Sequence, residues 1–458
     1  MTTTVAAGRR GPALVVLCFV QFMLVLDDTV VSVALPRVRD DLGFSAAGLT
    51  WVVNAYFVAF GGLLLFGRAA DLFGRRRVFL SGVALFGVAS LLCGIAQEPW
   101  QLVAGRFAQG AGAAMASPAA LALITLLFPG PEERARALGI WGGIAGLGGT
   151  AGLVISGALT GLASWRWIFL INLPIAVAAL ALLPRLVAES RASRPGRMDV
   201  PGAVLGTGAL VSLVYGLLQT AESGWGDIAA VGPLALAAVL AVSFVAVEAR
   251  AAEPLVPLSF LAVRIRAVAN CASFLFSAAF FAMAFLLMVH LQTVLGYQPL
   301  TAGLAYLPYA AGMLTGLWFS SRAVLRFGMR RTLVAAFLIG AVGLVLLAGV
   351  GPGDDYATVV LPGMLVTSLG CGLGNPALAI AAIEGTTEQD AGLGSAVLSS
   401  VQQVGGAVGV AVLVALAAGR AQAADPSEGF SLALTVAAAL LAFGALLVAA
   451  LPGKGSRA

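Results

Sequence analysis

The hydrophobic pattern of the chain is a series of long apolar blocks separated by short polar segments. Each block is about 20 residues long, the length of helix that crosses a hydrocarbon core of about 30 Å. Because such blocks continue to the C-terminus, we interpret the first one as a retained helix rather than a signal peptide. Fourteen transmembrane helices are predicted, at residues 12–34, 46–66, 78–96, 100–122, 138–162, 167–186, 201–220, 229–248, 267–290, 300–320, 331–350, 357–380, 393–418 and 430–451.

The basic residues alternate in number between successive polar segments. If the N-terminus is cytoplasmic, 21 of the 26 Lys and Arg residues fall in cytoplasmic segments and four in outer segments. Arg106 is left inside a predicted helix. Cytoplasmic loops of membrane proteins carry an excess of Lys and Arg. The alternation therefore predicts an even number of helices, with both termini cytoplasmic in a multi-pass protein of the cell membrane.

The composition supports a chain that lies in lipid. The chain has 458 residues, of which 60% are hydrophobic and 10% charged, whereas a soluble domain carries about 25% charged residues. Its mean hydropathy is +0.99. The net charge of +5 is explained by basic cytoplasmic loops, so we expect a lipid bilayer as partner and no nucleic acid. The four cysteines show no metal-ligand spacing, and no metal site is predicted.

A weak internal repeat relates the two halves of the chain. Residues 67–77 read GRAADLFGRRR, and residues 321–331, 254 positions later, read SRAVLRFGMRR. The same offset places the first predicted helix over the ninth. Parallel repeats of this kind are a transporter architecture, in which substrate binds near the membrane midplane between the halves. We therefore predict a six-helix bundle over 1–190, two inserted helices over 191–262 and a second six-helix bundle over 263–458.

Two acidic residues, Asp27 and Asp28, lie within the first predicted helix. An ionisable residue inside the membrane is a functional candidate by default. Burial disfavours the charged form of a carboxyl group, which suits an acid that binds and releases a proton. The alternative is that both acids lie near the outer interface and are solvated. Because neighbouring residues differ by 100° around a helix, only one of them is expected to face a cavity directly.

Arg106 lies within the fourth predicted helix. An arginine at this depth costs roughly 2.5–3.5 kcal/mol on insertion scales, so some acceptor must compensate its charge. Asp27 is the candidate carboxylate, and we predict that Asp27, Asp28 and Arg106 form a proton-coupling site. The alternative is a structural arginine that donates to backbone carbonyls.

The cytoplasmic segment after the second helix is a candidate gate. It contains Gly67, Asp71, Gly74, Arg75 and Arg76. An acid can accept from arginines or from a helix N-terminus, and a glycine permits a tight turn. Anchoring of the arginines to lipid headgroups is the simpler alternative.

The fifth predicted helix is rich in glycine at three- and four-residue spacings, which let two helix backbones approach closely. Gly146, Gly152 and Gly157 are predicted to take part in gating as a hinge or sliding surface. Static packing is the alternative.

Polar and aromatic residues inside the helices are candidates for a substrate cavity: Asn54, Tyr56, Gln109, Phe281 and Gln402. Each one can instead have a structural role, because a buried amide can satisfy the backbone of a broken helix.

Other classes of protein lack support in the sequence. A membrane sensor needs a soluble signalling domain, and no predicted loop is long enough to hold one. An enzyme needs a nucleophile and base or a metal site, but the chain has one histidine and no H-E-x-x-H motif. It also has no nucleotide-binding loop for ATP-driven transport.

Several segments together resemble the major facilitator superfamily, and specifically its fourteen-helix drug:proton antiporter branch. The segment after the second helix is similar to the family signature at Gly67, Asp71, Gly74, Arg75 and Arg76. The fourth helix is similar to a second signature at Leu102, Arg106, Gln109, Gly110 and Gly112. Residues 26–36, LDDTVVSVALP, resemble a branch signature that has Asn at the position of Ser32, and residues 165–174 also look typical.

This resemblance implies an all-α major facilitator fold of two six-helix bundles plus two inserted helices. It further implies proton-coupled efflux of small lipophilic drugs or antibiotics by alternating access. Asp27 would then be the proton-coupling acid, Arg106 its partner, and Asp71 a member of the cytoplasmic gate. We expect a monomer whose energy source is the proton gradient, with no cofactor.

Two departures from the family pattern affect these expectations. The antiporter signature of the fifth helix has Pro and Gly at the positions of Leu153 and Ser156, which leaves the direction of transport open. A dedicated exporter or symporter of a single metabolite is the alternative function. The tenth helix has no acidic residue between 301 and 320, which favours monovalent or neutral lipophilic substrates.

Overall fold

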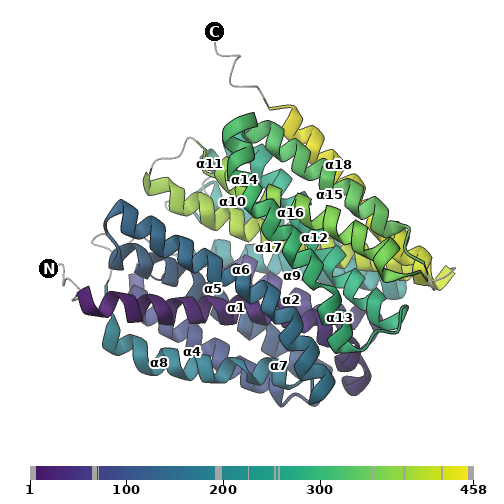
Figure 1. Cartoon of the computed structure of the whole chain (residues 1–458), viewed down its shortest axis with the longest axis horizontal. Coiled ribbons are helices and arrows are strands. Elements are labelled where there is room, and N and C mark those ends of the chain that lie inside the picture. Colours follow the sequence, from purple (N-terminus) through teal and green to yellow (C-terminus); the bar gives the residue numbers. More distant parts are fainter. Residues whose placement is uncertain are drawn as a thin grey trace, which may run out of the picture. The chain divides into compact units, whose positions relative to one another are not determined.

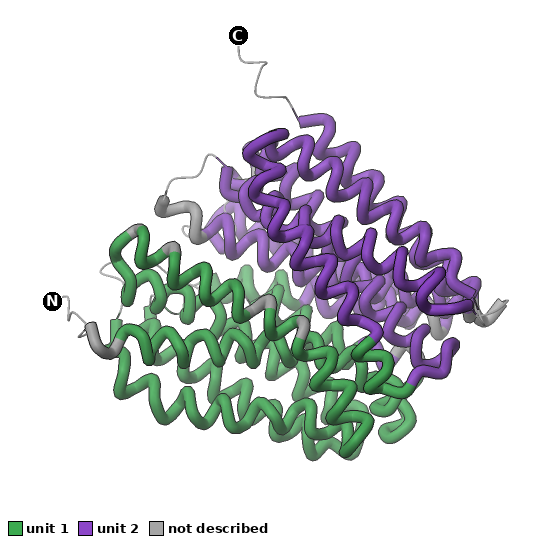
Figure 2. The backbone as a smooth tube through the Cα atoms, viewed as in Figure 1, with its two compact units in different colours: residues 1–45, 51–207, 298–304 green, residues 46–50, 208–297, 305–458 purple. Residues whose placement is uncertain are grey.

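A computed structural model describes the chain apart from residues 1–6, 64–69, 71, 191–198, 225, 252–253, 256–257, 352–353, 385–387, 424–425 and 452–458. Over the described residues the secondary structure is helical, without strands. The chain forms two compact units, which Figure 2 shows in different colours. Unit 1 comprises residues 1–45, 51–207 and 298–304, and unit 2 comprises residues 46–50, 208–297 and 305–458.

Unit 1 contains the helices of the N-terminal part of the chain together with a short helix from further on (Figure 1). They are α1 (Ala7–Leu42), most of α2 (Ala46–Leu63), α4 (Arg75–Gly94), α5 (Pro99–Leu127), α6 (Pro131–Leu162), α7 (Trp167–Leu170), α8 (Asn172–Leu186), the first residues of α9 (Val200–Ser223) and most of α13 (Pro299–Ala305). Proline in the first turn of α5 and α6 suits these positions, where its missing N–H would have no partner in the helix.

Unit 2 contains the remainder of α9 and the later helices. They are α10 (Ile228–Glu248), α11 (Leu258–Ala262), α12 (Arg264–Thr293), α14 (Leu307–Phe327), α15 (Met329–Ala348), the π-helical turn Tyr356–Val360, α16 (Leu361–Ala382), α17 (Glu388–Ala423) and α18 (Pro426–Ala449). The prediction of three domains at 1–190, 191–262 and 263–458 stays a prediction.

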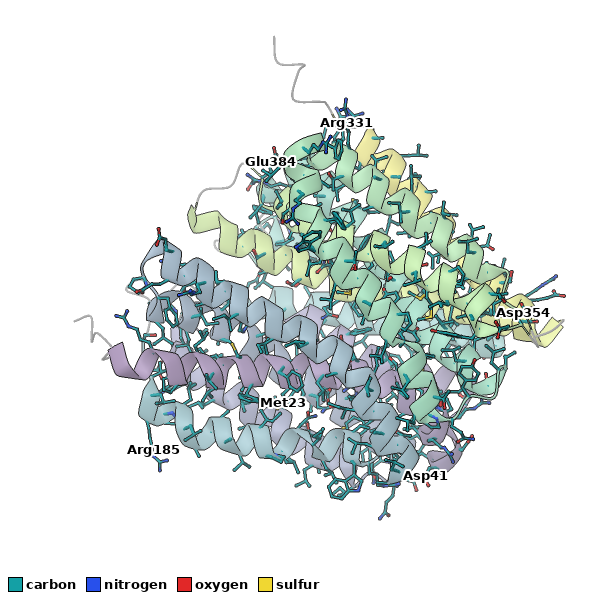
Figure 3. All side chains as sticks on the ribbon, in the orientation of Figure 1. Met23, Asp41, Arg185, Arg331, Asp354 and Glu384 are labelled. Carbon is teal, nitrogen blue, oxygen red and sulfur yellow. The ribbon has the colours of Figure 1, made fainter. Side chains whose placement is uncertain are left out.

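The predicted membrane-spanning segments coincide with helices. Within the described residues, twelve helices are long and apolar enough to cross a membrane. The two remaining predicted segments, 46–66 and 300–320, correspond to α2, whose apolar part is the shorter Gly48–Leu63, and to α13 with α14. Labelled charged residues lie at helix ends in each unit (Figure 3), with Asp41 and Arg185 at opposite ends of unit 1. Met23, labelled between them, is fully buried.

The internal repeat is visible in the backbone. Gly74 precedes α4 with φ 109°, and Gly328, 254 residues later, precedes α15 with φ 83°. Side chains with a Cβ atom rarely adopt such a φ, so both turns favour glycine. Corresponding helices also pack in pairs within their own units: α4 with α5 and α1 with α6 in unit 1, and α15 with α16 and α12 with α17 in unit 2.

Glycines set how closely α4 and α5 pack. A Cβ atom at Gly112 would lie 2.8 Å from the carbonyl oxygen of Gly82, and a Cβ atom at Gly82 would lie 2.7 Å from that of Gly112. Neither helix has room for a larger residue at this crossing. Close backbone approach at small residues is a principal source of helix association in membranes. The crossing therefore holds the two helices that carry much of the polar centre of unit 1.

We predict that Gly112→Ala lowers the stability of the purified protein by about 1–3 kcal/mol, because the backbones of α4 and α5 must move apart. Gly139→Ala is the matched control, since a Cβ atom there meets nothing within 4 Å. Alanine is the better helix former by about 1 kcal/mol. A thermal melt in detergent should show a lower midpoint for Gly112→Ala alone. Equal midpoints for the two variants would contradict the packing described here.

Candidate functional site

The centre of unit 1 is a buried carboxylate, Asp27 on α1, with no solvent exposure. Its Oδ1 accepts from Gln109 Nε2 at 2.9 Å and from Asn172 Nδ2 at 2.7 Å. Its Oδ2 accepts from Arg106 Nη1 at 2.5 Å. Three donors on α5 and α8 thus converge on one carboxylate of α1. Both oxygens of the carboxylate therefore act as hydrogen-bond acceptors.

Arg106 is equally buried and has several partners. Its Nε donates to the carbonyl oxygen of Val52 on α2 at 2.8 Å. Its Nη1 donates to Gln109 Oε1 at 2.9 Å as well as to Asp27. The guanidinium carbon also lies 4.6 Å from the ring centre of Tyr56, a distance at which the ring attracts a cation. The structure therefore shows the Arg106–Asp27 contact that the sequence alone left open.

A second layer of hydrogen bonds fixes the donors. Ser90 on α4 accepts from Gln109 Nε2 at 2.8 Å and from Asn172 Nδ2 at 3.3 Å. Asn172 is the first residue of α8, directly after the break at Ile171 that separates α7 from α8. The break places the amide at a helix start in the core of unit 1. Sequence reasoning did not assign Ser90 or Asn172 to the site, because single small polar residues in a helix are common structural elements.

Small residues on α5 let other helices reach this network. A Cβ atom at Gly110 would lie 2.4 Å from the carbonyl oxygen of Tyr56, so α2 packs directly on α5 there. A Cβ atom at Gly105 would lie 2.5 Å from Cys93 Sγ of α4. The glycines of the L-x-x-x-R-x-x-Q-G-x-G segment thus bring α2 and α4 close to α5, and with them the acceptors of α2 and α4.

The ion pair between Asp27 and Arg106 is costly to break. Removing one partner of a buried ion pair leaves an uncompensated charge and typically costs about 3–5 kcal/mol. In unit 1 the pair connects α1 with α5, and its other partners extend the connection to α2, α4 and α8. A change in the charge of Asp27 therefore acts on five helices at once.

Asp28 does not belong to this network. It is partly exposed, and its buried Oδ1 has no hydrogen-bond partner among the described residues. It still lies within electrostatic range of Asp27 and Arg106. The expectation that the two neighbouring acids point in different directions agrees with this arrangement.

The candidate gate is described in part, since Gly67 and Asp71 lie outside the described residues. At the start of α4, the Glu189 carboxylate accepts from the backbone N–H of Arg76 and of Arg77, each at 3.1 Å. The side chain of Arg76 donates from Nη1 to the carbonyl oxygen of Val187 at 3.0 Å. A carboxylate at a helix N-terminus is favourable for the helix dipole.

Glu189 and Ser190, which follow the end of α8, both bond to the start of α4. The backbone N–H of Arg75 donates to the carbonyl oxygen of Ser190 at 2.9 Å. A Cβ atom at Gly74 would lie 2.6 Å from Glu189 Oε1, so glycine leaves space for the carboxylate. Sequence reasoning missed Glu189 because it lies 113 residues from Arg76 in a segment that carries no signature of its own.

Two of the α6 glycines pack tightly within unit 1. A Cβ atom at Gly152 would lie 2.0 Å from Thr29 Oγ1 of α1, and one at Gly157 would lie 2.7 Å from the carbonyl oxygen of Pro299 at the start of α13. Gly146 lies in α6, but its packing falls outside the described residues. The Ser156 hydroxyl donates to the carbonyl oxygen of Val30. The serine at this position thus supplies a bond to α1 that the family's usual glycine lacks.

The candidate cavity residues are divided between the two units. Tyr56 and Gln109 contact Arg106 and so belong to the buried network of unit 1. Asn54 is fully buried, and both polar atoms of its side chain lack a partner among the described residues. In unit 2, Gln402 Nε2 donates to Asn375 Oδ1 at 3.4 Å, while Phe281 packs beside Gly406. Their role in substrate binding stays a prediction.

Comparisons with known proteins agree on one kind of protein. A family model described as Major Facilitator Superfamily matches residues 17–410. The chain is 42% identical over 436 residues to "Puromycin resistance protein pur8" of Streptomyces alboniger, covering 93% of this chain and 86% of that protein. It is 40% identical over 442 residues to "Cephamycin export protein CmcT" of Amycolatopsis lactamdurans, covering 93% and 91%.

A solved structure shows the same fold at low identity. The chain matches a peptide transporter POT in complex with sulfate, with a TM-score of 0.71, 15% identity and coverage of 96% of this chain and 94% of that chain. A likeness at this identity supports the fold alone.

We predict that Glu189→Ala speeds hydrogen exchange at the Arg76 and Arg77 amides by about 10- to 100-fold, because each loses a hydrogen bond to a charged acceptor. Exchange mass spectrometry of the peptide that covers the start of α4 measures this. Glu132→Ala, which removes an exposed acid from the first turn of α6, should leave that peptide unchanged. No acceleration in Glu189→Ala would show that the carboxylate does not hold the helix start.

Proposed function

The chain belongs to the Major Facilitator Superfamily of membrane transporters, and from this premise we propose that it exports small lipophilic drugs or antibiotics in exchange for protons. The observation that carries the proposal is the buried pair of Asp27 and Arg106. A fully buried carboxylate that holds several helices in a transporter is a suitable place for a proton to change the structure. The resistance and export functions named for the two relatives support export of antibiotics.

Protonation of Asp27 would act through its three hydrogen bonds. The charged carboxylate accepts from Arg106, Gln109 and Asn172. A protonated carboxyl group has one acceptor fewer and no charge to offset the guanidinium. Arg106 would then depend on the Val52 carbonyl and on Gln109. Since the donors come from α5 and α8, loss of these bonds favours a different arrangement of the helices around α1.

The energy source in this proposal is the proton gradient, without a cofactor, and the transporting unit is a monomer. Alternation of Lys and Arg along the sequence supports a multi-pass protein of the cell membrane with both termini cytoplasmic. A reporter that is active only in the cytoplasm, fused after residue 458, should therefore be active. An active periplasmic or extracellular reporter at the same position would contradict this orientation.

A second candidate function is a dedicated exporter of a single metabolite. The two relatives are each named for one antibiotic, which favours a narrow substrate range. Import of a metabolite by symport belongs to the same alternative, because the antiporter signature of α6 departs from its usual pattern at Leu153 and Ser156. Transport assays with a panel of unrelated antibiotics separate the two candidates: export of several supports a multidrug function, and export of one supports a dedicated function.

We predict that Asp27→Asn abolishes antibiotic transport driven by a pH gradient in everted membrane vesicles, because asparagine cannot exchange a proton. A protonophore should abolish transport by the unchanged protein. Asp40→Asn, which removes an exposed acid near the outer end of α1, is the control and should transport normally.

The same experiment needs a variant that separates transport from folding. Asp27→Asn leaves the Arg106 charge buried without its counter-ion, which destabilises the protein. The double variant Asp27→Asn/Arg106→Gln removes both charges and should restore the yield of folded protein without restoring transport. Gradient-driven transport by either variant at the rate of the unchanged protein would overturn the assignment of Asp27.

A further inference from the structure

The α1 helix has a second polar face that the Asp27 network does not use. Gln21, Asp28 and Ser32 lie seven and four residues apart, which places them along one side of the helix. All three are partly exposed, whereas Asp27 is fully buried. Val25 lies between the first two on this side and is also partly exposed. The face therefore combines polar groups with an apolar surface.

The unpartnered atoms on this face are both acceptors. Gln21 Oε1 and Asp28 Oδ1 are buried, and neither has a hydrogen-bond partner among the described residues. Arg106, which lies within electrostatic range of Asp28, already donates to Asp27. A buried carboxylate oxygen without a donor is costly, so a ligand that supplies hydrogen-bond donors is favoured at this face.

The charges around Asp28 indicate which charge a ligand at this face would carry. Arg106 and Asp27 form an ion pair that is neutral as a whole. When Asp28 is ionised, it adds one negative charge within electrostatic range of that pair, and the ion pairs among the described residues do not include it. The three groups then carry one net negative charge inside a spanning helix. A single positive charge neutralises it.

We propose that Asp28 binds the positively charged amino group of the substrate, so that the transported compounds include monocationic amphiphiles. This inference rests on the proposed function as an exporter. The ammonium group donates to Asp28, and Gln21 offers a further acceptor for the compound about two turns away along α1. The apolar part of the compound lies against Val25. The positive charge of the substrate contacts Asp28 and not the pair of Asp27 and Arg106, so recognition of charge and proton coupling use different acids.

Two glycines of α6 lie beside this face of α1. A Cβ atom at Gly149 would lie 3.8 Å from Val25 Cγ1, and Gly152 packs against Thr29, the residue next to Asp28. The glycines let α6 approach α1 beside the acid without placing a competing cation there. The sequence of α6 between residues 137 and 162 contains no Lys or Arg, so this part of α6 supplies no cation to Asp28.

A matched pair of probes tests the proposal. The first is a dansylated alkylamine, which carries one primary ammonium group, and the second is its N-acetyl derivative, which is neutral. Binding to the purified full-length protein in lipid nanodiscs is followed by dansyl fluorescence. We expect the unchanged protein to bind the ammonium probe about tenfold or more tightly than the acetylated probe. Asp28→Asn should lose this preference, and Asp28→Glu should retain much of it.

Control variants and outcomes make the result decisive. Asp40→Asn removes an acid from the same helix outside the face and should keep the preference. Equal affinities for the two probes in the unchanged protein, absence of ammonium binding, or a preference that survives Asp28→Asn each overturn the proposal. Loss of binding of both probes in a folded Asp28→Asn variant also overturns it, because the acid would then act on more than the charge.

The exporter function is tested separately by gradient-driven transport of an antibiotic in vesicles. A protein that transports but shows no charge preference contradicts only the role of Asp28. A protein that shows the preference but does not transport contradicts only the exporter function.

Discussion

The ion pair between Asp27 and Arg106 is the interaction on which the rest of unit 1 depends. Two opposite charges without solvent exposure are tolerated only while each is fully hydrogen-bonded. That requirement fixes α1 relative to α5, places the start of α8 at the carboxylate, and brings the Val52 carbonyl of α2 to the guanidinium. The glycines of α5 follow from the same requirement, because larger residues would hold α2 and α4 away from the pair.

In the proposed mechanism the pair is a two-state element. With Asp27 charged, all three donors have an acceptor; with Asp27 protonated, the donors on α5 and α8 must find others. The energy at stake, about 3–5 kcal/mol, is enough to reverse a conformational equilibrium. The bonds between Glu189 and the start of α4 form another contact within unit 1, just beyond the C-terminal end of α8.

Much of the fold was predictable, because long apolar blocks have one stable structure in lipid. The repeat also extended to local geometry, as the turns at Gly74 and Gly328 show. The site was predictable only in its charged members. Asp27 and Arg106 stand out because charges are rare in apolar helices, whereas Ser90 and Asn172 resemble many small polar residues with packing roles. Glu189 was hidden because its partners are backbone N–H groups, which no sequence pattern marks.

The central claim is that a proton on Asp27 and the bound substrate exclude each other through the buried pair. Proton release on substrate addition, measured with a pH-sensitive dye in weakly buffered solutions of the purified protein, tests it most directly. The account predicts that the unchanged protein releases protons when an exported antibiotic binds and that Asp27→Asn, with its folding verified, releases none. Equal release by both proteins would contradict it.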